Sequence, residues 1–218
     1  MKINFIVTID GKSATGKSLI AKEIKKKYPE FFILDTGNFY RALTFFFLKN
    51  NVEIDKEKIS NYFSENKLNI CFDENNISVN NLKVEKTDLF EENINFLVAK
   101  LATILVVREK LLIFFQNISF KYSKIIAVGR DCGTNIFKNA DLKFFVTSKK
   151  SLQFIRRSTQ KSSKDFVFKR DNLDENRKIS PLTMAEDAIL IKNNFFSKKL
   201  LMKKIFYYFE KSYLNENL

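Results

Sequence analysis

Short apolar runs recur along the chain, and they are apolar nearly throughout, which is the pattern of strands buried on both faces of a sheet. They lie at Ile3 to Ile9, Phe31 to Leu34, Ile125 to Val128, Lys143 to Val146 and Ala188 to Ile191. Longer stretches with helical periodicity separate them, at Lys17 to Lys27, Phe39 to Lys49, Asn95 to Ser119, Lys149 to Lys161 and Phe196 to Ser212. Because strands alternate with helices, we predict an α/β fold in which a five-stranded parallel sheet has helices on both faces.

One segment departs from this alternation. Residues 67 to 84, KLNICFDENNISVNNLKV, alternate apolar and polar side chains with a period of two. Asparagine-rich turns at 75–76 and 80–81 divide the segment into three short pieces. We therefore predict a small antiparallel meander, inserted between two helical stretches.

The composition fits one globular domain. The chain has 218 residues, of which 45% are hydrophobic, and a net charge of +13. That charge permits a polyanionic partner such as nucleic acid or an acidic membrane surface. The chain is also rich in Lys, Asn, Ile and Phe, with 24 Phe and no Trp, which is typical of biased codon usage. We favour the compositional explanation, and we expect no stable complex with nucleic acid.

The reactive residue types narrow the chemistry. Histidine is absent, which excludes histidine bases and histidine metal ligands. Cys71 and Cys132 form no CxxC pair, and we interpret them as reduced, buried thiols of a cytoplasmic protein. The N-terminus has too few apolar residues for a signal peptide. The most apolar segment, Val98 to Ile118, carries several charges, so we expect one or two buried helices and no membrane span.

The stretch IDGKSATGKS carries the first motif. Gly11 to Ser18 matches GxxxxGK[ST], and it follows a predicted strand and precedes a predicted helix. Glycines let backbone N–H groups turn toward an anion, and the following helix presents its positive end to the same anion. Lys17 can reach the outer phosphates of a nucleotide, and the Ser18 hydroxyl can ligate Mg²⁺. The alternative is an ordinary polar turn, but the strand and helix on either side favour a phosphate loop.

Two further motifs follow predicted strands. In DTGNFYR, Gly37 suits a turn and Asn38 suits a helix N-cap, which would place Arg41 in the first helical turn, within reach of a second anion. Taken alone, Arg41 is better interpreted as a solvated helix charge. In GRDCGT, Arg130 and Asp131 stand at the carboxyl edge of a central strand, where open α/β sheets bind ligands. A structural ion pair is the alternative, and beside a phosphate loop we favour a functional one.

The region from 156 to 182 is crowded with cations, including RR at 156–157, and RDNLDENR at 170–177 is followed by SPL. It could be a charged pair of surface helices. It could also be a mobile flap that carries arginines to a phosphate. Arginines that arrive from several segments suit a reaction whose transition state carries phosphate charge.

Taken in order, these motifs closely resemble the cytidylate kinase family, the bacterial CMP kinases among the nucleoside monophosphate kinases. The resemblance runs through IDGKSATGKS, LDTGNFYRAL, VVREKL, GRDCGT, AD-KFFVTS, RR, RDNLDENRKISPL and A-DAI, and it covers nearly the whole chain. GRD-GT combined with R-D-NR-SPL is far more specific than the phosphate loop alone. The meander lies where this family has an extra small sheet in its NMP-binding domain.

The resemblance implies an enzyme that phosphorylates CMP, and also dCMP, by direct in-line transfer from ATP with Mg²⁺. It implies a monomer with a core (1–37, 96–155 and 175–218), an NMP-binding insertion (about 38–95) and a short lid (about 156–174). The expected catalytic residues are Lys17, Arg130, Asp131, Arg156 and Arg177. The expected ATP contacts are Gly11, Lys12, Ser13, Ala14, Thr15, Gly16, Lys17, Ser18, Leu19 and Arg157, with Ser18 on the metal. The expected CMP contacts are Thr36, Tyr40, Arg41, Arg108, Arg130, Asp131, Arg170, Asp174 and Arg177.

Within that set, the resemblance gives each group a role. Arg41, Arg130 and Arg177 resemble a clamp on the CMP phosphate. Arg108 and Asp131 resemble readers of the cytosine, since a carboxylate accepts from its amino group and an arginine donates to N3 and O2. Arg170 and Asp174 resemble sugar contacts, and Arg156 and Arg157 resemble lid arginines that close on ATP. No strong base is needed, because phosphoryl transfer depends mostly on positioning and charge neutralisation.

The chain also departs from the family pattern. Lys12 replaces a common proline and Leu19 a hydroxyl residue, while Ala99 and Val106 replace a serine and a basic residue near the base. The lid is about ten residues shorter than is usual in the family. A kinase with relaxed choice between CMP and UMP therefore remains an alternative. A basic P-loop protein that binds nucleic acid is another, although Lys17, Ser18 and every clamp arginine are kept. Lys12 has no inherited role, and we expect it at the outer edge of the loop, adding general positive potential.

Overall fold

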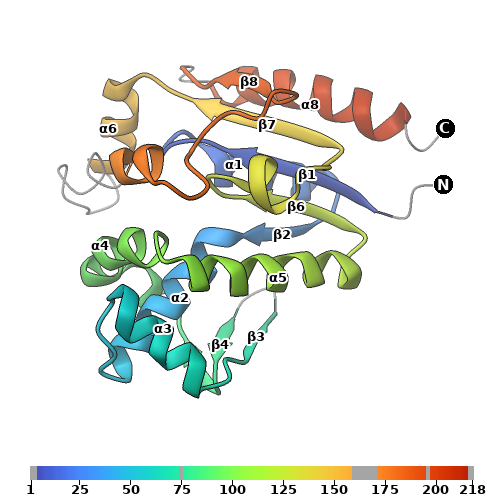
Figure 1. The fold of residues 1–218 in the computed structure, drawn as a ribbon. Coiled ribbons are helices and arrows are strands. Elements are labelled where there is room, and N and C mark those ends of the chain that lie inside the picture. The colour runs from blue at the N-terminus through green and yellow to red at the C-terminus, as the bar shows by residue number, and fades with distance from the viewer. Residues whose placement is uncertain (1–3, 74–75, 159–170, 195–196, 216–218) are drawn as a thin grey trace.

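The main sheet of the computed structural model has five parallel strands (Figure 1). The structure describes residues 4–73, 76–158, 171–194 and 197–215. The strands are β1 (Phe5–Asp10), β2 (Phe32–Asp35), β6 (Lys124–Val128), β7 (Leu142–Thr147) and β8 (Ile189–Lys192). Their order in the sheet is β2-β6-β1-β7-β8. The five predicted strands are thus confirmed to within a few residues at their ends.

The register of the sheet gathers the predicted motifs at one edge. In the central strand, Ile9 lies opposite Val128 of β6, and Asp10 lies opposite Phe145 of β7. On the far side of β6, Asp35 of β2 also lies opposite Val128. Because the strands are parallel and end at matching levels, the segments that follow β1, β2 and β6 leave the sheet side by side. Those segments are the phosphate loop, the start of the DTGNFYR helix and the GRDCGT turn.

Helices cover both faces of the sheet, as predicted. They are α1 (Lys17–Lys27), α2 (Thr36–Lys49), α3 (Lys56–Glu65), α4 (Glu92–Leu101), α5 (Leu105–Lys121), α6 (Lys150–Ser158) and α8 (Lys198–Asn215). Shorter helical segments are η1 (Asp88–Phe90), the π-helix η2 (Cys132–Ile136) and a turn at 171–176. The predicted helix from Asn95 to Ser119 is two helices, α4 and α5. The pattern missed α3, in which only Ile59 is buried, because so little of that helix faces a core.

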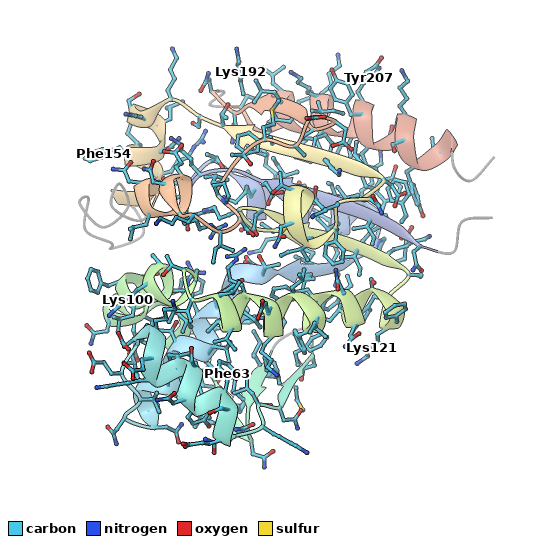
Figure 2. The ribbon with its side chains drawn as sticks, in the orientation of Figure 1. Phe63, Lys100, Lys121, Phe154, Lys192 and Tyr207 are labelled. Carbon is cyan, nitrogen blue, oxygen red and sulfur yellow. The ribbon has the colours of Figure 1, made fainter. Side chains whose placement is uncertain are left out.

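Two apolar cores hold these layers together. One lies between the sheet and α1 and α8, and it includes Ile20, Ile24 and Phe209. The other lies between the sheet and α2 and α5, and it includes Phe47 and Phe115. Figure 2 shows side chains filling these layers, whereas Tyr207 on α8, which is 63% exposed, points outward. Because these two cores bury both faces of the sheet, the predicted site lies at the carboxyl edge of the sheet.

The predicted meander is present as a separate three-stranded antiparallel sheet (Figure 1). Its strands are β3 (Ile70–Phe72), β4 (Ile77–Val79) and β5 (Leu82–Val84). The turn at 80–81 joins β4 and β5 with both asparagines at positive φ, 46° and 66°, the conformation of a tight two-residue hairpin. The predicted turn at 75–76 lies partly outside the described residues. The sheet packs on α2, with the rings of Phe39 and Phe72 5.6 Å apart.

Three predictions about single residues were wrong, those for Cys71, Asn38 and Arg41. Cys71 was expected to be buried, but it is exposed, because it lies on the solvated face of β3 while Cys132 is buried. Asn38 was expected to cap a helix, but α2 already begins at Thr36. Asp35 is the N-cap and accepts a hydrogen bond from the Gly37 N–H at 3.1 Å, since the strand ends directly on a capping side chain. Arg41 consequently lies beyond the first helical turn.

In the described parts of the chain, no helix combines the length and the apolar character that crossing a membrane requires.

Candidate active site

The segment between β1 and α1 wraps into a tight loop. Gly11 and Gly16 have φ of 141° and 100°, and Ala14 has φ of 55°. A Cβ on Gly11 would lie 2.1 Å from the carbonyl oxygen of Val146, so only glycine fits at that position. The first residue of α1 is Lys17, which places the positive end of the helix directly behind the loop. The loop therefore has the conformation that the sequence motif predicted.

Lys17 folds back over its own loop. Its side chain is buried, and Nζ donates a hydrogen bond to the Lys12 carbonyl at 2.6 Å. Burial holds the pKa of Lys17 well below its ordinary value, and the positive charge of Arg130 lowers it further. Negative charges on Asp171, Asp35 and Asp10 act in the opposite direction. Phosphate groups beside Lys17 would add to those negative charges and favour its charged form.

The next residues of α1 are open to solvent. Ser18 and Leu19 are both exposed in the first turn of the helix. The Ser18 hydroxyl could therefore ligate Mg²⁺ together with nucleotide phosphates. Leu19 replaces a hydroxyl residue and can contribute only its backbone N–H to an anion.

Arg130 joins the phosphate loop to the opposite side of the site. Its Nη1 donates to the Gly11 carbonyl and its Nη2 to Ser13 Oγ, each at 2.9 Å. Its Nε donates to Asp174 Oδ2, also at 2.9 Å. The Asp174 and Asp171 carboxylates raise the pKa of Arg130 against the effect of burial. Arg130 thus lies between the loop and the acidic helical turn at 171–176.

Asn193 and Arg156 support the outer side of the loop. Asn193, which is buried after the end of β8, donates through Nδ2 to the Thr15 carbonyl at 2.8 Å. Arg156 donates through Nη1 to the Ala14 carbonyl at 3.5 Å and to Ser148 Oγ at 3.2 Å. Arg156 therefore touches the loop that it was expected to close over. Asn193 was missed, and the sequence offered no signal beyond its position after a predicted strand.

Asp131 lies between two buried arginines. Asp131 Oδ2 accepts a hydrogen bond from Arg108, and Oδ1 lies 3.0 Å from Arg177 Nη2. Both arginine side chains are only 4% exposed. The structure thus brings the two expected base readers together with one of the expected phosphate clamps. A shared carboxylate offsets the cost of burying two guanidinium groups.

Tyr40 and Thr36 complete this side of the site. The ring of Tyr40 lies 5.9 Å from the guanidinium carbon of Arg108, and burial raises the pKa of Tyr40 to about 12. The hydroxyl therefore stays protonated and can only donate or accept hydrogen bonds. Thr36 Oγ1 donates to the Val128 carbonyl at 3.0 Å, which ties the start of α2 to the end of β6.

The remaining predicted residues are placed as follows. The guanidinium carbon of Arg41 lies 5.2 Å from the centre of the Phe90 ring, and so it faces η1. Asp174 Oδ1 lies 3.5 Å from Arg177 Nη1, so Asp174 bridges Arg130 and Arg177. Arg170 and the side chain of Arg157 lie outside the described part of the structure.

Asp10 is a buried carboxylate that the sequence reasoning missed. Its two oxygens accept hydrogen bonds from the N–H groups of Cys132 at 2.9 Å and Gly133 at 2.7 Å. Burial raises the pKa of Asp10 to about 6, although these two hydrogen bonds act against the shift. Asp10 thereby fixes the turn that carries Arg130 and Asp131. An acidic residue between an apolar strand and the first loop glycine was the signal available.

Lys12 has a specific partner, contrary to the expectation of a general positive potential. Its Nζ lies 2.6 Å from Glu175 Oε1 on the helical turn at 171–176. Both side chains are about one-third exposed, at 34% and 36%. The ion pair places the charge of Lys12 against one carboxylate and joins the phosphate loop to the helical turn at 171–176.

A phosphate loop between β1 and α1 that faces a set of buried arginines defines a P-loop kinase. The solved structure titled TT1252 from Thermus thermophilus has a similar fold, with a TM-score of 0.50 and 15% sequence identity, covering 96% of this chain and 98% of that one. The sequence is more specific, since a family model described as cytidylate kinase matches residues 7–211. The chain belongs to the cytidylate kinase family.

Individual relatives agree with that assignment. The chain is 38% identical over 214 residues to a protein of Clostridium botulinum strain Langeland named cytidylate kinase, with 93% of this chain and 96% of the relative covered. It is 36% identical over 222 residues to a bifunctional pantoate ligase/cytidylate kinase of Prochlorococcus marinus strain MIT 9215. That second match covers 94% of this chain but 42% of the bifunctional protein, so it concerns one part of it.

Proposed function

We propose that this protein transfers the terminal phosphoryl group of ATP to CMP, and also to dCMP, with Mg²⁺ as the metal. The observation that carries the proposal is the buried group of Arg108, Asp131 and Arg177 next to the phosphate loop. It supplies an acceptor and donors for a base, and it stands at the sheet edge where the loop would hold ATP. Membership of the cytidylate kinase family supports the same reaction.

The chemistry of Asp131 and Arg108 favours cytosine. The Asp131 carboxylate only accepts hydrogen bonds, so it suits the exocyclic amino group of cytosine. Arg108 only donates, so it suits N3 and O2 of the same ring. Uracil has a carbonyl oxygen in place of that amino group and would oppose one acceptor to another. Because Asp131 is paired with Arg108 and Arg177, CMP would have to share or displace these partners.

The phosphates would lie between the loop and the arginines. Lys17 and the loop N–H groups would hold the β- and γ-phosphates of ATP, with Ser18 on Mg²⁺. Arg130, Arg177 and Arg41 would hold the CMP phosphate, and Arg156 would support the loop from its outer side. Mg²⁺ would neutralise charge on the transferring group when bound. Together, the loop residues and the arginines would orient the two substrates in line and exclude water. No side chain would then have to act as a strong base.

The chain would be organised as a core domain with two smaller substrate-binding segments. Residues about 38–95, with the small sheet, would form the NMP-binding insertion, and residues about 156–174 would form the lid. Arg157 and Arg170 would act from the lid. We infer a monomer that works in the cytoplasm without a nucleic acid or membrane partner.

ADP release measured with CMP, dCMP, UMP and AMP as acceptors tests this function directly. We expect fast ADP release with CMP and dCMP, slower release with UMP, and loss of all turnover when EDTA removes Mg²⁺. Lys17→Ala is the matched inactive control. The proposal fails if CMP does not stimulate ADP release, whereas equal rates with CMP and UMP favour the kinase of relaxed base choice. Salt-sensitive RNA binding without turnover would favour the nucleic-acid alternative.

A further inference from the structure

The helical turn at 171–176 presents three acidic side chains to the phosphate loop and to the arginines beside it. Asp171, Asp174 and Glu175 have the i, i+3, i+4 spacing that puts side chains on one face of a helix. Asp171 Oδ1 accepts a hydrogen bond from the Ser13 N–H at 3.0 Å, and Glu175 pairs with Lys12 at 2.6 Å. Two of the three acids therefore hold the phosphate loop.

The third acid holds the acceptor side. Asp174 bonds Arg130 at 2.9 Å and lies 3.5 Å from Arg177. This helical turn thus contacts the loop expected to bind ATP and two of the three arginines expected to bind the CMP phosphate, Arg130 and Arg177. The path between the two substrate sites needs no other element.

The helical turn contacts residues 12–13 of the loop, and the carbonyl of residue 12 in turn binds the Lys17 ammonium. Lys12 accepts the Lys17 ammonium on its carbonyl oxygen at 2.6 Å. Glu175 fixes the side chain of Lys12, and Asp171 fixes the N–H of Ser13. A shift of residues 12–13 would therefore move the atom that positions Lys17.

The loop needs outside support because its backbone is strained. Ala14 has φ of 55°, a left-handed backbone conformation that residues other than glycine adopt at a cost in free energy. Such a conformation persists only where the surroundings determine it. Asp171 holds the residue before Ala14, and Asn193 holds the residue after it. Removing Asp171 releases one of these two fixed points.

Burial makes Asp171 the stronger of the two contacts. Asp171 is 5% exposed, so its hydrogen bond to the loop is shielded from water. The Lys12–Glu175 pair is about one-third exposed and is worth less, as partly solvated ion pairs are. Asp171 also lies 3.7 Å from Arg130, which places it beside both substrate sites.

We propose that Asp171, and Glu175 through Lys12, are positioning residues that couple occupation of the acceptor site to the shape of the phosphate loop. An acceptor phosphate that draws Arg130 toward itself changes the contacts of Arg130 with Gly11, Ser13 and Asp174. Asp171 and Glu175 transmit that change to residues 12–13 and thus to Lys17. CMP and ATP then each bind more tightly when the other is present, by the same factor in both directions. The inference rests on the proposed function, since it takes CMP and ATP as the two ligands.

Calorimetry with a non-hydrolysable ATP analogue and Mg²⁺, with and without saturating CMP, measures this factor. For the wild-type protein we expect CMP to tighten analogue binding about fivefold or more. Asp171→Ala should bring the factor close to one, while the affinity for CMP alone stays within about threefold of wild type. Asp171→Asn keeps an oxygen that can accept from the Ser13 N–H, so it should recover much of the lost coupling.

Lys12→Ala and Glu175→Gln test the second contact. Each should lower the coupling factor severalfold, and the double variant should lower it no further, because one ion pair is lost in all three. The matched control is Lys198→Ala with Glu23→Gln, which removes a 2.7 Å ion pair between α8 and α1. That control should keep the wild-type factor.

Three results would overturn the inference. The first is a wild-type coupling factor of one, which would leave CMP turnover and the proposed function intact. The second is an Asp171→Ala variant that melts at a lower temperature but keeps the full factor, which would make Asp171 a purely structural residue. The third is additive loss in Lys12→Ala and Glu175→Gln, which would show that the two residues act apart. If instead wild-type protein fails to phosphorylate CMP, the proposed function itself is wrong.

Discussion

Arg177 and Asp131 form a buried ion pair, with 3.0 Å between Nη2 and Oδ1, although they lie far apart in the sequence. The pair joins the segment after the helical turn at 171–176 to the turn after β6. A group expected to hold the CMP phosphate is thereby fixed to a group expected to read the base. Recognition of the base and clamping of the phosphate are therefore expected to share one carboxylate.

Asp131→Asn should relax the choice of base. The amide can present its oxygen or its NH₂ group, so it can pair with cytosine or with uracil. We expect kcat/KM for CMP to fall by roughly 100-fold and the preference for CMP over UMP to disappear or invert. Steady-state ADP release with both acceptors measures the ratio. A variant with wild-type selectivity would show that Asp131 does not read the base.

Asp131→Asn should also destabilise the fold, because it removes the carboxylate that the buried Arg108 and Arg177 share and leaves Arg177 with Asp174 at 3.5 Å. Breaking a buried pair costs about 3–5 kcal/mol, and a bound acceptor phosphate would offset part of that cost. Thermal melting with and without CMP separates the loss of stability from the loss of selectivity.

Lys17→Ala and Lys12→Ala should differ sharply. Lys17 is the lysine that we propose holds the outer phosphates of ATP, so its removal should lower kcat by at least about 100-fold. The side chain of Lys12 acts through a partly exposed ion pair, and its removal should lower kcat/KM for ATP less than about tenfold. Initial rates at varied ATP give both values. Equal losses would mean that the roles of the two lysines are misassigned.

Asp10 should make folding stability depend on pH. Its pKa is raised from 3.8 to about 6 in the folded protein, so the folded state binds the proton more tightly than the unfolded chain does. Its ionisation therefore destabilises the fold progressively as pH rises between those two values, by about 3 kcal/mol in full. Asp10→Asn has no such titration.

The comparison needs only urea unfolding at two pH values. Between pH 4.5 and pH 7, wild-type protein should lose about 2 kcal/mol of unfolding free energy more than Asp10→Asn does. Parallel changes in the two proteins would show that Asp10 is not shifted.

Asn193→Ala should weaken the phosphate loop from its outer side. It removes the donor to the Thr15 carbonyl and leaves that buried acceptor unpaired, which costs about 1–3 kcal/mol. We expect a lower melting temperature and a raised KM for ATP, with KM for CMP nearly unchanged. Asn194→Ala is the matched control, because Asn194 bonds the Lys149 N–H on an exposed loop. Similar effects of both variants on KM for ATP would contradict this role.

The two cysteines should react with a thiol reagent at very different rates. Cys71 is exposed on β3. Cys132 is buried, and burial raises its pKa well above the ordinary value. Native protein should therefore show one fast thiol, which Cys71→Ser removes, and a second thiol that appears only on unfolding. Two fast thiols would mean that the turn around Cys132 opens readily.

Local chemistry made several residues predictable. Gly11, Gly16 and Lys17 lie in a motif whose spacing fixes the loop, and the two asparagines at 80–81 fix a hairpin. Asp131 and Arg108 were predicted to act together only through the family resemblance. No local sequence pattern indicates that these two residues lie close together. Cys71 and Asn38 were misjudged because burial and capping depend on which face is covered and where the preceding strand stops.

The sequence by itself determined the alternation of strands and helices, the small antiparallel sheet and the phosphate loop, because hydrophobic periodicity and turn chemistry act over a few neighbouring residues. The tertiary structure decided that Asp10 fixes the turn after β6, that Asn193 supports Thr15, and that Lys12 and Ser13 are held by Glu175 and Asp171. These contacts join residues more than a hundred positions apart, and no periodicity encodes them. They exist because parallel strands end at one edge of the sheet and deliver distant segments to the same place.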